Sequence, residues 1–172
     1  MATKLSDKWA TPPEFYRFVH RIWAPTIDVC AEPHNAKCKI YIDEAQDGLT
    51  TDWVALARKK KVRPVFWCNP GYSDVTPWID VANEVQYEGG TTLLLAHHNF
   101  SAAWFAVASS ISSLCLLLTP RIKFIDPSGA GRQAPSGSNC LFVIDPLAIE
   151  LPCSTQHFDW NFFQNVYPGT EE

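Results

Sequence analysis

The tetrapeptide Asn69-Pro70-Gly71-Tyr72 follows a short apolar run, residues 65–68, and contains groups that can act on the amino group of a nucleobase. The side-chain oxygen of Asn69 and the backbone oxygen of Pro70 are two acceptors for the two N–H groups of an exocyclic amine. Pro70 stiffens this arrangement, and the ring of Tyr72 can stack on a base that has been extruded from a duplex. An ordinary loop is the alternative, because Asn, Pro and Gly are common turn residues.

Helix-start signals precede two amphipathic segments. Thr11 is the expected N-cap of the first, with Pro12 in its first turn and Glu14 closing a capping box. The pair Thr76-Pro77 repeats the signal further along the chain. The predicted helices span residues 11–23, residues 76 to the glycines at 89–90, and residues 101–110.

Short apolar runs alternate with these helices and predict strands. The expected strands are residues 26–31, 39–42, 65–68, 91–96, 114–119, 121–126 and 140–145, and the basic run at residues 59–63 is expected to be a solvated loop. This alternation predicts an α/β fold with a mostly parallel sheet and helices on both faces. The last two strands flank a Gly/Pro/Ser-rich stretch and predict a C-terminal antiparallel β-hairpin at or near an edge of the sheet.

In folds of this class, ligands bind outside the carboxyl ends of the parallel strands. The loops after Cys30, Cys68 and Ala96 should therefore open on one side of the sheet. The tetrapeptide belongs to the second of these loops, so the expected site lies on that side.

Composition places the chain among globular proteins. Its 172 residues are 47% hydrophobic and 19% charged, which predicts one domain over residues 1–172. No apolar stretch approaches the roughly 20 residues that span a bilayer, and no signal peptide is recognisable, so we expect a protein that is neither embedded in a membrane nor secreted. The net charge of −4 argues against a general nucleic-acid binder, so any contact with phosphates must be local.

The six cysteines lie in or beside apolar segments, which favours reduced thiols in the core over disulfides. Cys30, His34 and Cys38 recur every four residues and could line one face of a helix, as metal ligands can. The usual zinc pattern of one C-x-x-C pair and a distant second pair is missing, so no metal is expected. A small metal-binding structural domain stays as an alternative that elemental analysis can exclude.

Five segments, from about Trp9 to Ile144, resemble in their order the phage-type DNA N6-adenine methyltransferases, which use S-adenosylmethionine. The tetrapeptide itself resembles the Asn/Asp-Pro-Pro-aromatic motif of amino methyltransferases that act on DNA. The segments are WATPPEF, DVCAEPHNAKC, DGLTTDW, WCNPGY, and RIKFIDPSG with the later GSNCLFVI. The resemblance implies a Rossmann-like fold, a DNA substrate and a cytoplasmic enzyme, in the host cell if a phage carries the gene.

The resemblance also implies roles for individual residues. Asn69, Pro70 and Tyr72 form the catalytic set, which orients the target amine and stacks the base. The Asp28 carboxylate complements the ammonium group of the cofactor, and the helix start at Thr11 suits the cofactor carboxylate. The residues expected at the cofactor are Trp9, Thr11, Pro12, Asp28, Ala31, Asp47, Asp52 and Trp53. Those expected at DNA are Lys60, Lys61, Arg63, His97, His98, Arg121, Lys123 and Arg132.

Several of these assignments have purely structural alternatives. Asp28 and Asp47 can be ordinary turn residues, Thr11 can serve as a helix cap alone, and Trp53 can be part of the core. For Lys60 and its basic neighbours, solvation is the first interpretation and phosphate contact the second.

Two departures from the family pattern leave further alternatives open. Gly71 stands where the family has a second proline, which loosens the loop before Tyr72. His97 and His98 replace the family's usual turn after the middle strand. They are, in order of preference, solvated residues, phosphate contacts or part of a changed base-reading surface. Transfer to cytosine N4 needs the same acceptors as transfer to adenine N6, and a DNA-binding module with weakened catalysis would share the fold.

Overall fold

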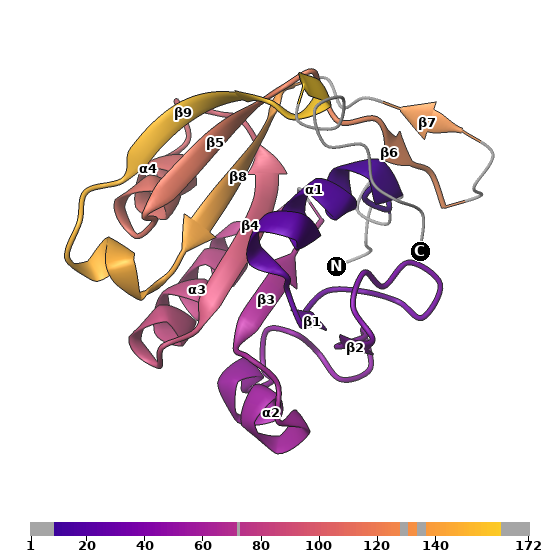
Figure 1. The fold of residues 1–172 in the computed structure, drawn as a ribbon, viewed down its shortest axis with the longest axis vertical. Coiled ribbons are helices and arrows are strands. Elements are labelled where there is room, and N and C mark those ends of the chain that lie inside the picture. Colours follow the sequence, from indigo (N-terminus) through magenta and orange to yellow (C-terminus); the bar gives the residue numbers. More distant parts are fainter. Residues whose placement is uncertain (1–8, 72, 128–130, 134–136, 163–172) are drawn as a thin grey trace.

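A computed structural model of the protein describes residues 9–71, 73–127, 131–133 and 137–162 (Figure 1). The helices are α1 (Pro13–Trp23), α2 (Trp53–Lys60), α3 (Thr76–Tyr87), α4 (Ala103–Ser110) and the short 3-10 helix η2 (Pro146–Ile149). The strands are β1 (Ile27–Asp28), β2 (Ile40–Tyr41), β3 (Val65–Cys68), β4 (Thr91–His97), β5 (Leu114–Thr119), β6 (Phe124–Ile125), β7 (Arg132–Gln133), β8 (Asn139–Ile144) and β9 (Ser154–Asp159).

Seven of the strands form one mixed sheet in the order β2-β1-β3-β4-β8-β5-β9. Strand β8 runs antiparallel to its neighbours β4 and β5, and every other pair in this sheet is parallel. The expected α/β fold with a mostly parallel sheet is therefore confirmed. The remaining two strands, β6 and β7, pair with each other in a small antiparallel ribbon.

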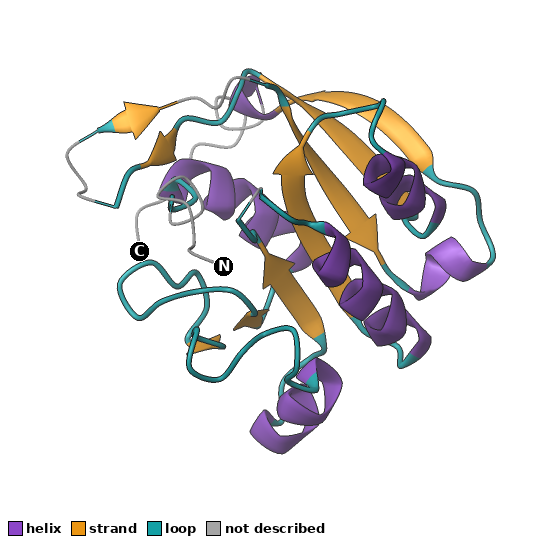
Figure 2. Cartoon of the chain, turned by 180° about the vertical axis from the view of Figure 1, so that it is seen from behind, coloured by secondary structure: helices purple, strands orange, loops and turns teal. Residues whose placement is uncertain are grey.

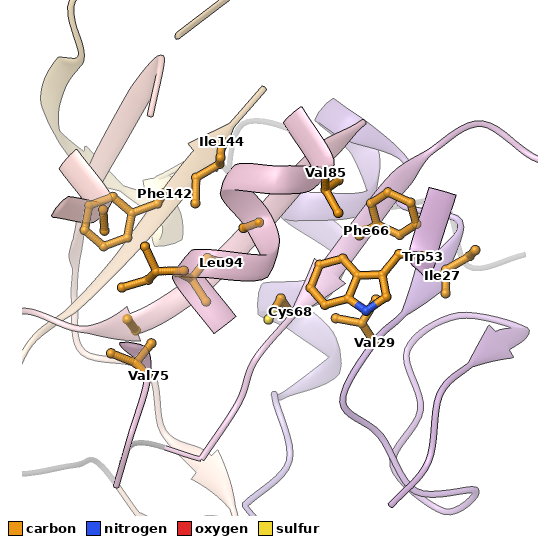
Figure 3. Packing of buried hydrophobic residues seen from close by; sticks show 14 of the residues in the cluster. Ile27, Val29, Trp53, Phe66, Cys68, Val75, Val85, Leu94, Phe142 and Ile144 are labelled. Atoms are coloured by element: carbon orange, nitrogen blue, oxygen red, sulfur yellow. The ribbon is translucent and has the colours of Figure 1, made fainter. Parts of the chain in front are cut away.

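Helices cover both faces of the sheet, as expected. Figures 1 and 2 view the molecule from opposite sides, with α1 in front in one and α3 and α4 in front in the other. Side chains of β3, β4 and β8 alternate between two buried clusters. Phe66 and Cys68 of β3 join α2, α3 and α4 on one face, whereas Trp67 joins α1 on the other. Figure 3 shows the first cluster, with Trp53 of α2 beside Phe66 and Val29.

The expected position of the hairpin is wrong in detail. Residues 121–126 do not pair with β8; instead, β8 forms its hairpin with β5 and also pairs with β4, inside the sheet. The reason is burial, because all six residues of β8 are buried and such a strand needs neighbours on both sides. The edge strand beyond β8 and β5 is β9, which the sequence did not predict because its side chains are mostly exposed and polar.

Two local expectations at helix starts also change. The N-cap of α1 is Pro12 rather than Thr11, and no side chain caps this helix. Glu14 does not close a capping box, since its carboxylate forms an ion pair with Arg132 of β7. The basic run at residues 59–63, expected to be a loop, begins inside helix α2, which extends to Lys60. The N-cap of α2, Asp52, accepts a hydrogen bond from the Ala55 N–H over 2.8 Å.

Candidate active site

The carboxyl ends of β1, β3 and β4 lie at the same edge of the sheet, because these strands are parallel. Asp28 ends β1, Cys68 ends β3 and His97 ends β4. The loops that follow them open on this carboxyl edge, as the sequence predicted. Asn69 and Pro70 are the first residues of the middle loop.

A cavity of about 750 Å³, here called the main cavity, lies at this edge. Its volume falls within the range of roughly 300–1,000 Å³ that is typical of small-molecule sites. Its lining comes from the loops after β1, β2 and β3, with additions from α3 and from the residues after β6. The lining residues are Val29, Cys30, Ala31, Glu32, His34, Asn35, Ile42, Asp43, Glu44, Asp47, Gly48, Asn69, Pro70, Gly71, Trp78 and Pro127.

A second, polar cavity of about 30 Å³, here called the inner cavity, adjoins the first. Cys30, Asn35 and Asn69 line both cavities, so the two share a wall. The lining of the inner cavity is Trp9, Ala10, Thr11, Asp28, Cys30, Asn35, Lys37, Trp67 and Asn69. Five of the residues expected at the cofactor therefore line one cavity or the other: Ala31 and Asp47 the main one, and Trp9, Thr11 and Asp28 the inner one.

Asn69 is held at both its backbone and its side chain. Its backbone N–H donates to Cys30 Sγ over 3.1 Å, and its side-chain Nδ2 donates to Thr11 Oγ1 over 3.0 Å. The second bond turns the side-chain oxygen away from Thr11. Pro70 is buried and Gly71 lines the main cavity. Tyr72, the third residue of the expected catalytic set, lies outside the described residues.

Asp28 is a buried carboxylate, 3% exposed, at the end of β1. Its oxygens accept hydrogen bonds from the backbone N–H groups of Lys37, over 2.9 Å, and Cys30, over 3.4 Å. Desolvation raises the pKa of Asp28 to about 6, although the two N–H groups oppose this effect. A cation placed beside Asp28 would favour its ionised form, so this carboxylate is suited to an ammonium group.

Of the segment from Asp47 to Trp53, only Asp47 and Gly48 line the main cavity. Asp47 has a positive φ of 58° and its carboxylate accepts from the Leu49 N–H, so it shapes a turn. Gly48 has no room for a side chain, because a Cβ would lie 2.2 Å from the Val29 carbonyl oxygen. Its own carbonyl accepts from Trp53 Nε1 over 2.7 Å.

Three residues expected at the cofactor thus have other surroundings. Trp53 is 1% exposed in the core, Asp52 caps α2, and Pro12 is the buried N-cap of α1. The aromatic wall of the main cavity is instead Trp78, in the first turn of α3, which packs against Trp53 with a ring separation of 6.3 Å. An indole placed so soon after the tetrapeptide was the signal that could have identified it.

The basic residues expected at DNA divide between the two edges of the sheet. Lys60 ends α2, and Lys61 caps it with a φ of 57°. Arg63 lies just before β3, where its Nη2 donates to the Trp23 and Ala24 carbonyls over 3.5 and 3.3 Å. This is the amino edge, opposite Asn69.

The other basic residues expected at DNA lie near the carboxyl edge. Arg121 and Lys123 are exposed and follow the carboxyl end of β5. Arg132, on β7, is held against α1 by its ion pair with Glu14. The β6–β7 ribbon is attached to the segment before α1, because Ala10 and Ile125 exchange two backbone hydrogen bonds.

His97 and His98, at the end of β4, pack into an aromatic cluster. The His97 ring lies 5.2 Å from Trp104, and the His98 ring 3.9 Å from Phe100. Burial lowers the pKa of His97, which favours its neutral form. Phe100 is 63% exposed at the carboxyl edge.

Cys30 and Cys38, whose spacing could suit metal ligands, have different hydrogen-bond partners in the structure. Cys30 accepts from the Asn69 N–H, whereas the Cys38 thiol is hydrogen-bonded to the Tyr16 hydroxyl at 3.1 Å. Among the described residues, no group of three His, Cys, Asp or Glu side chains is arranged to hold a metal ion. Within the same part of the chain, no helix is both long and apolar enough to cross a membrane.

The parallel sheet, with one antiparallel strand and a large cavity at its carboxyl edge, defines a Rossmann-like methyltransferase fold. Residues 1–152 match the family model described as DNA N-6-adenine-methyltransferase (Dam), and the chain belongs to this family. Members of the family use S-adenosylmethionine. The chain is also similar to the DNA N-6-adenine-methyltransferase of Haemophilus phage HP1, with 29% identity over 153 residues, covering 85% of this chain and 84% of the relative.

Proposed function

We propose that Asn69 and Pro70 carry methyl transfer to the N6 amino group of adenine in DNA by holding that amine at the wall of the main cavity, where S-adenosylmethionine binds. The observation that carries this proposal is the position of Asn69. It is the first residue after β3, it lines both cavities, and its amide nitrogen is already bound to Thr11. Its side-chain oxygen therefore remains as an acceptor for a substrate.

The chemistry requires acceptors because the lone pair of an exocyclic amine is delocalised into the ring. The Asn69 side-chain oxygen and the Pro70 carbonyl accept the two N–H bonds and hold the nitrogen in one orientation. As the nitrogen forms its new bond to the methyl carbon, the bond from that carbon to the cofactor's sulfur would break, and the nitrogen would become more positive until it releases one proton to solvent. The two oxygens stabilise that charge more strongly than they stabilise the neutral amine, which lowers the barrier.

The main cavity fits the cofactor by its chemistry as well as its volume. When bound, S-adenosylmethionine supplies an electrophilic methyl group on a cationic sulfonium. Asp28, beside the shared wall, would face the ammonium group, and Trp78 offers an apolar surface for the purine. The four carboxylates of the main cavity complement a ligand that carries positive charge and hydroxyl groups; they are Glu32, Asp43, Glu44 and Asp47.

DNA would approach the carboxyl edge. Of the basic residues expected at DNA, Arg121, Lys123 and Arg132 lie near that edge, and they supply local positive charge that a chain of net charge −4 needs for phosphate contact. Lys60, Lys61 and Arg63 stand at the opposite edge, so a duplex that presents a base to Asn69 would not reach them.

The test is incorporation of a labelled methyl group from S-adenosylmethionine into DNA, followed by identification of the modified nucleoside. N6-methyl-2′-deoxyadenosine in the digest supports the proposal. N4-methyl-2′-deoxycytidine would point to the chemically nearest alternative, which uses the same two acceptors. DNA binding without any incorporation would identify a module with weakened catalysis.

A further inference from the structure

We propose that Thr11 is a positioning residue for methyl transfer: its hydroxyl holds the Asn69 amide with the oxygen toward the target amine. This inference rests on the proposed role of Asn69. It gives Thr11 a role that is neither the helix cap nor the cofactor contact predicted from the sequence.

The two residues are 58 positions apart and meet at the inner cavity. Asn69 Nδ2 donates to Thr11 Oγ1 over 3.0 Å, and Thr11 is only 2% exposed, so bulk solvent has little access to the hydroxyl. Thr11 is also anchored on both sides. Ala10 exchanges two backbone hydrogen bonds with Ile125 of β6, and Pro12 is the N-cap of α1.

The orientation of this amide matters because an asparagine side chain has a donor end and an acceptor end. A half-turn about its last side-chain bond exchanges the two. The target amine presents N–H groups and therefore needs the acceptor end. With the ends exchanged, Nδ2 would face the amine, and two donors would oppose each other without a hydrogen bond.

A hydroxyl can donate as well as accept, so the orientation of the Asn69 amide also depends on where the Thr11 proton points. Asp28 lines the same small cavity as Thr11, and the negative charge of its carboxylate would favour a Thr11 proton that points into that cavity. With the proton directed into the cavity, the lone pairs of Oγ1 are available to Nδ2. Cys30 holds the other side of Asn69 by accepting from its backbone N–H. The amide is thus positioned before the substrate arrives.

The decisive variant is Thr11→Val, which keeps the shape of the side chain and removes the hydroxyl. We expect kcat to fall about tenfold or more, because the loss of one buried hydrogen bond releases the orientation of the reacting group. The dissociation constant for S-adenosylmethionine, measured by calorimetry, should stay within about twofold, since the change acts on the amine and not on the cofactor. Thr11→Ser retains the hydroxyl and should restore most of kcat.

Thr92→Val is the matched control. Thr92 is a fully buried threonine on β4, and its hydroxyl has no hydrogen-bond partner among the described residues. Its replacement should leave both kcat and cofactor affinity unchanged. This pair of variants separates the loss of a buried hydroxyl in general from the loss of the bond to Asn69.

Wild-type kcat in Thr11→Val would overturn the inference. A loss confined to cofactor affinity would overturn it as well and identify Thr11 as a cofactor contact. The variant Asn69→Ala shows whether only the positioning role of Thr11 is wrong or the proposed function of Asn69 is wrong as well. If Asn69→Ala is inactive and Thr11→Val is fully active, only the positioning role is wrong; if Asn69→Ala is itself active, the proposed site is wrong.

Should Thr11→Val fail to fold, the wild-type protein decides by nuclear magnetic resonance. The Asn69 side-chain N–H signals, assigned by their loss in Asn69→Asp, should exchange with water far more slowly than those of the exposed Asn99. Slow exchange supports the bond to Thr11, and exchange as fast as that of Asn99 contradicts it.

Discussion

Strand β3 runs between two edges of the sheet. The residues before it and the residues after it both indicate function in the sequence, but their surroundings in the structure differ. A basic run, residues 59–63, precedes the strand at the amino edge, and Asn69-Pro70 follow it at the carboxyl edge. At the amino edge, Arg63 binds the carbonyls that end α1, and Lys61 caps α2. At the carboxyl edge, Asn69 borders two cavities.

The difference follows from the direction of the elements. In a parallel α/β fold, helices end where strands begin, so the amino edge collects the free carbonyls and the negative ends of helix dipoles. Cations placed there stabilise the fold. Strands end and helices begin at the carboxyl edge, which leaves loops and polar groups to face a ligand. A basic run before a strand is thus weaker evidence for DNA contact than basic residues after one.

The largest expected effect is at the carboxyl edge. Asn69→Ala should lower the rate of methyl transfer by about 100- to 1,000-fold, as the loss of a preorganised polar group does in other active sites. The dissociation constant for S-adenosylmethionine should not change. Labelled-methyl incorporation and calorimetry measure the two quantities, with Asn83→Ala on α3 as the control, since Asn83 lines neither cavity. Near-wild-type turnover in Asn69→Ala would contradict the proposed site.

Asp28→Asn should weaken cofactor binding and remove its pH dependence. Because the pKa of Asp28 is raised to about 6 by burial, the wild-type carboxyl becomes protonated below that pH and no longer attracts an ammonium group. Wild-type affinity for S-adenosylmethionine should therefore fall by up to about tenfold per pH unit below this pKa, while the variant stays flat. Calorimetry over a pH series tests this. If the affinity for S-adenosylmethionine has the same pH dependence in both proteins, Asp28 does not contact the cofactor.

The same carboxyl predicts a stability effect of known sign in the absence of cofactor. Folding raises its pKa from 3.8 to about 6, so its favourable contribution is fully present below the lower value and is lost as the pH rises through the higher one. The loss amounts to about 3 kcal/mol. Relative to wild type, Asp28→Asn should become progressively more stable in urea denaturation as the pH rises over this window. A difference that does not change with pH would show that Asp28 does not titrate in this range.

Two exposed lysines sharpen the comparison of the edges. Lys123→Ala, near the carboxyl edge, should reduce the slope of log affinity for DNA against log salt by about one unit. Lys60→Ala, on α2 at the amino edge, should leave the slope unchanged. Fluorescence anisotropy with labelled duplex over a salt series measures both slopes. Equal reductions would mean that DNA extends over both edges.

Arg63→Ala tests the structural role of the amino edge directly. The variant loses the hydrogen bonds to the Trp23 and Ala24 carbonyls, which should lower the free energy of unfolding by about 1 kcal/mol. Affinity for DNA should remain at the wild-type level. If the variant has normal stability and weakened DNA binding, Arg63 contacts DNA, as expected from the sequence.

The smallest expected effect is at Gly71. Replacement by proline should reduce the entropy that the loop loses when it closes over a base, which improves the apparent Michaelis constant for DNA or the turnover by at most about tenfold. Steady-state kinetics with a short duplex is the measurement. A folded but inactive Gly71→Pro would show that the glycine is required by the backbone geometry of this loop.

The sequence was most informative where local pattern and tertiary role agree. Strand β3 and its tetrapeptide were predicted together, because a buried parallel strand is a continuous apolar run and its end is marked by turn residues. Helix α2 was missed because its last turn is basic, and charge indicates exposure without separating a helix from a loop. Strand β9 was missed because an exposed edge strand has no buried face to produce alternation.

By itself, the sequence determined the α/β class, the edge at which the proposed site lies and the two proposed acceptors at the end of β3, since these follow from local periodicity and from side-chain chemistry. Tertiary structure alone decided which partners those side chains take. Thr11 and Glu14 have the spacing of a capping box, yet they bind Asn69 and Arg132, far away in the chain. The physical reason is that a hydroxyl or carboxylate satisfies its hydrogen bonds with whichever group the fold brings near, and residue spacing contains no information about groups that come from other elements.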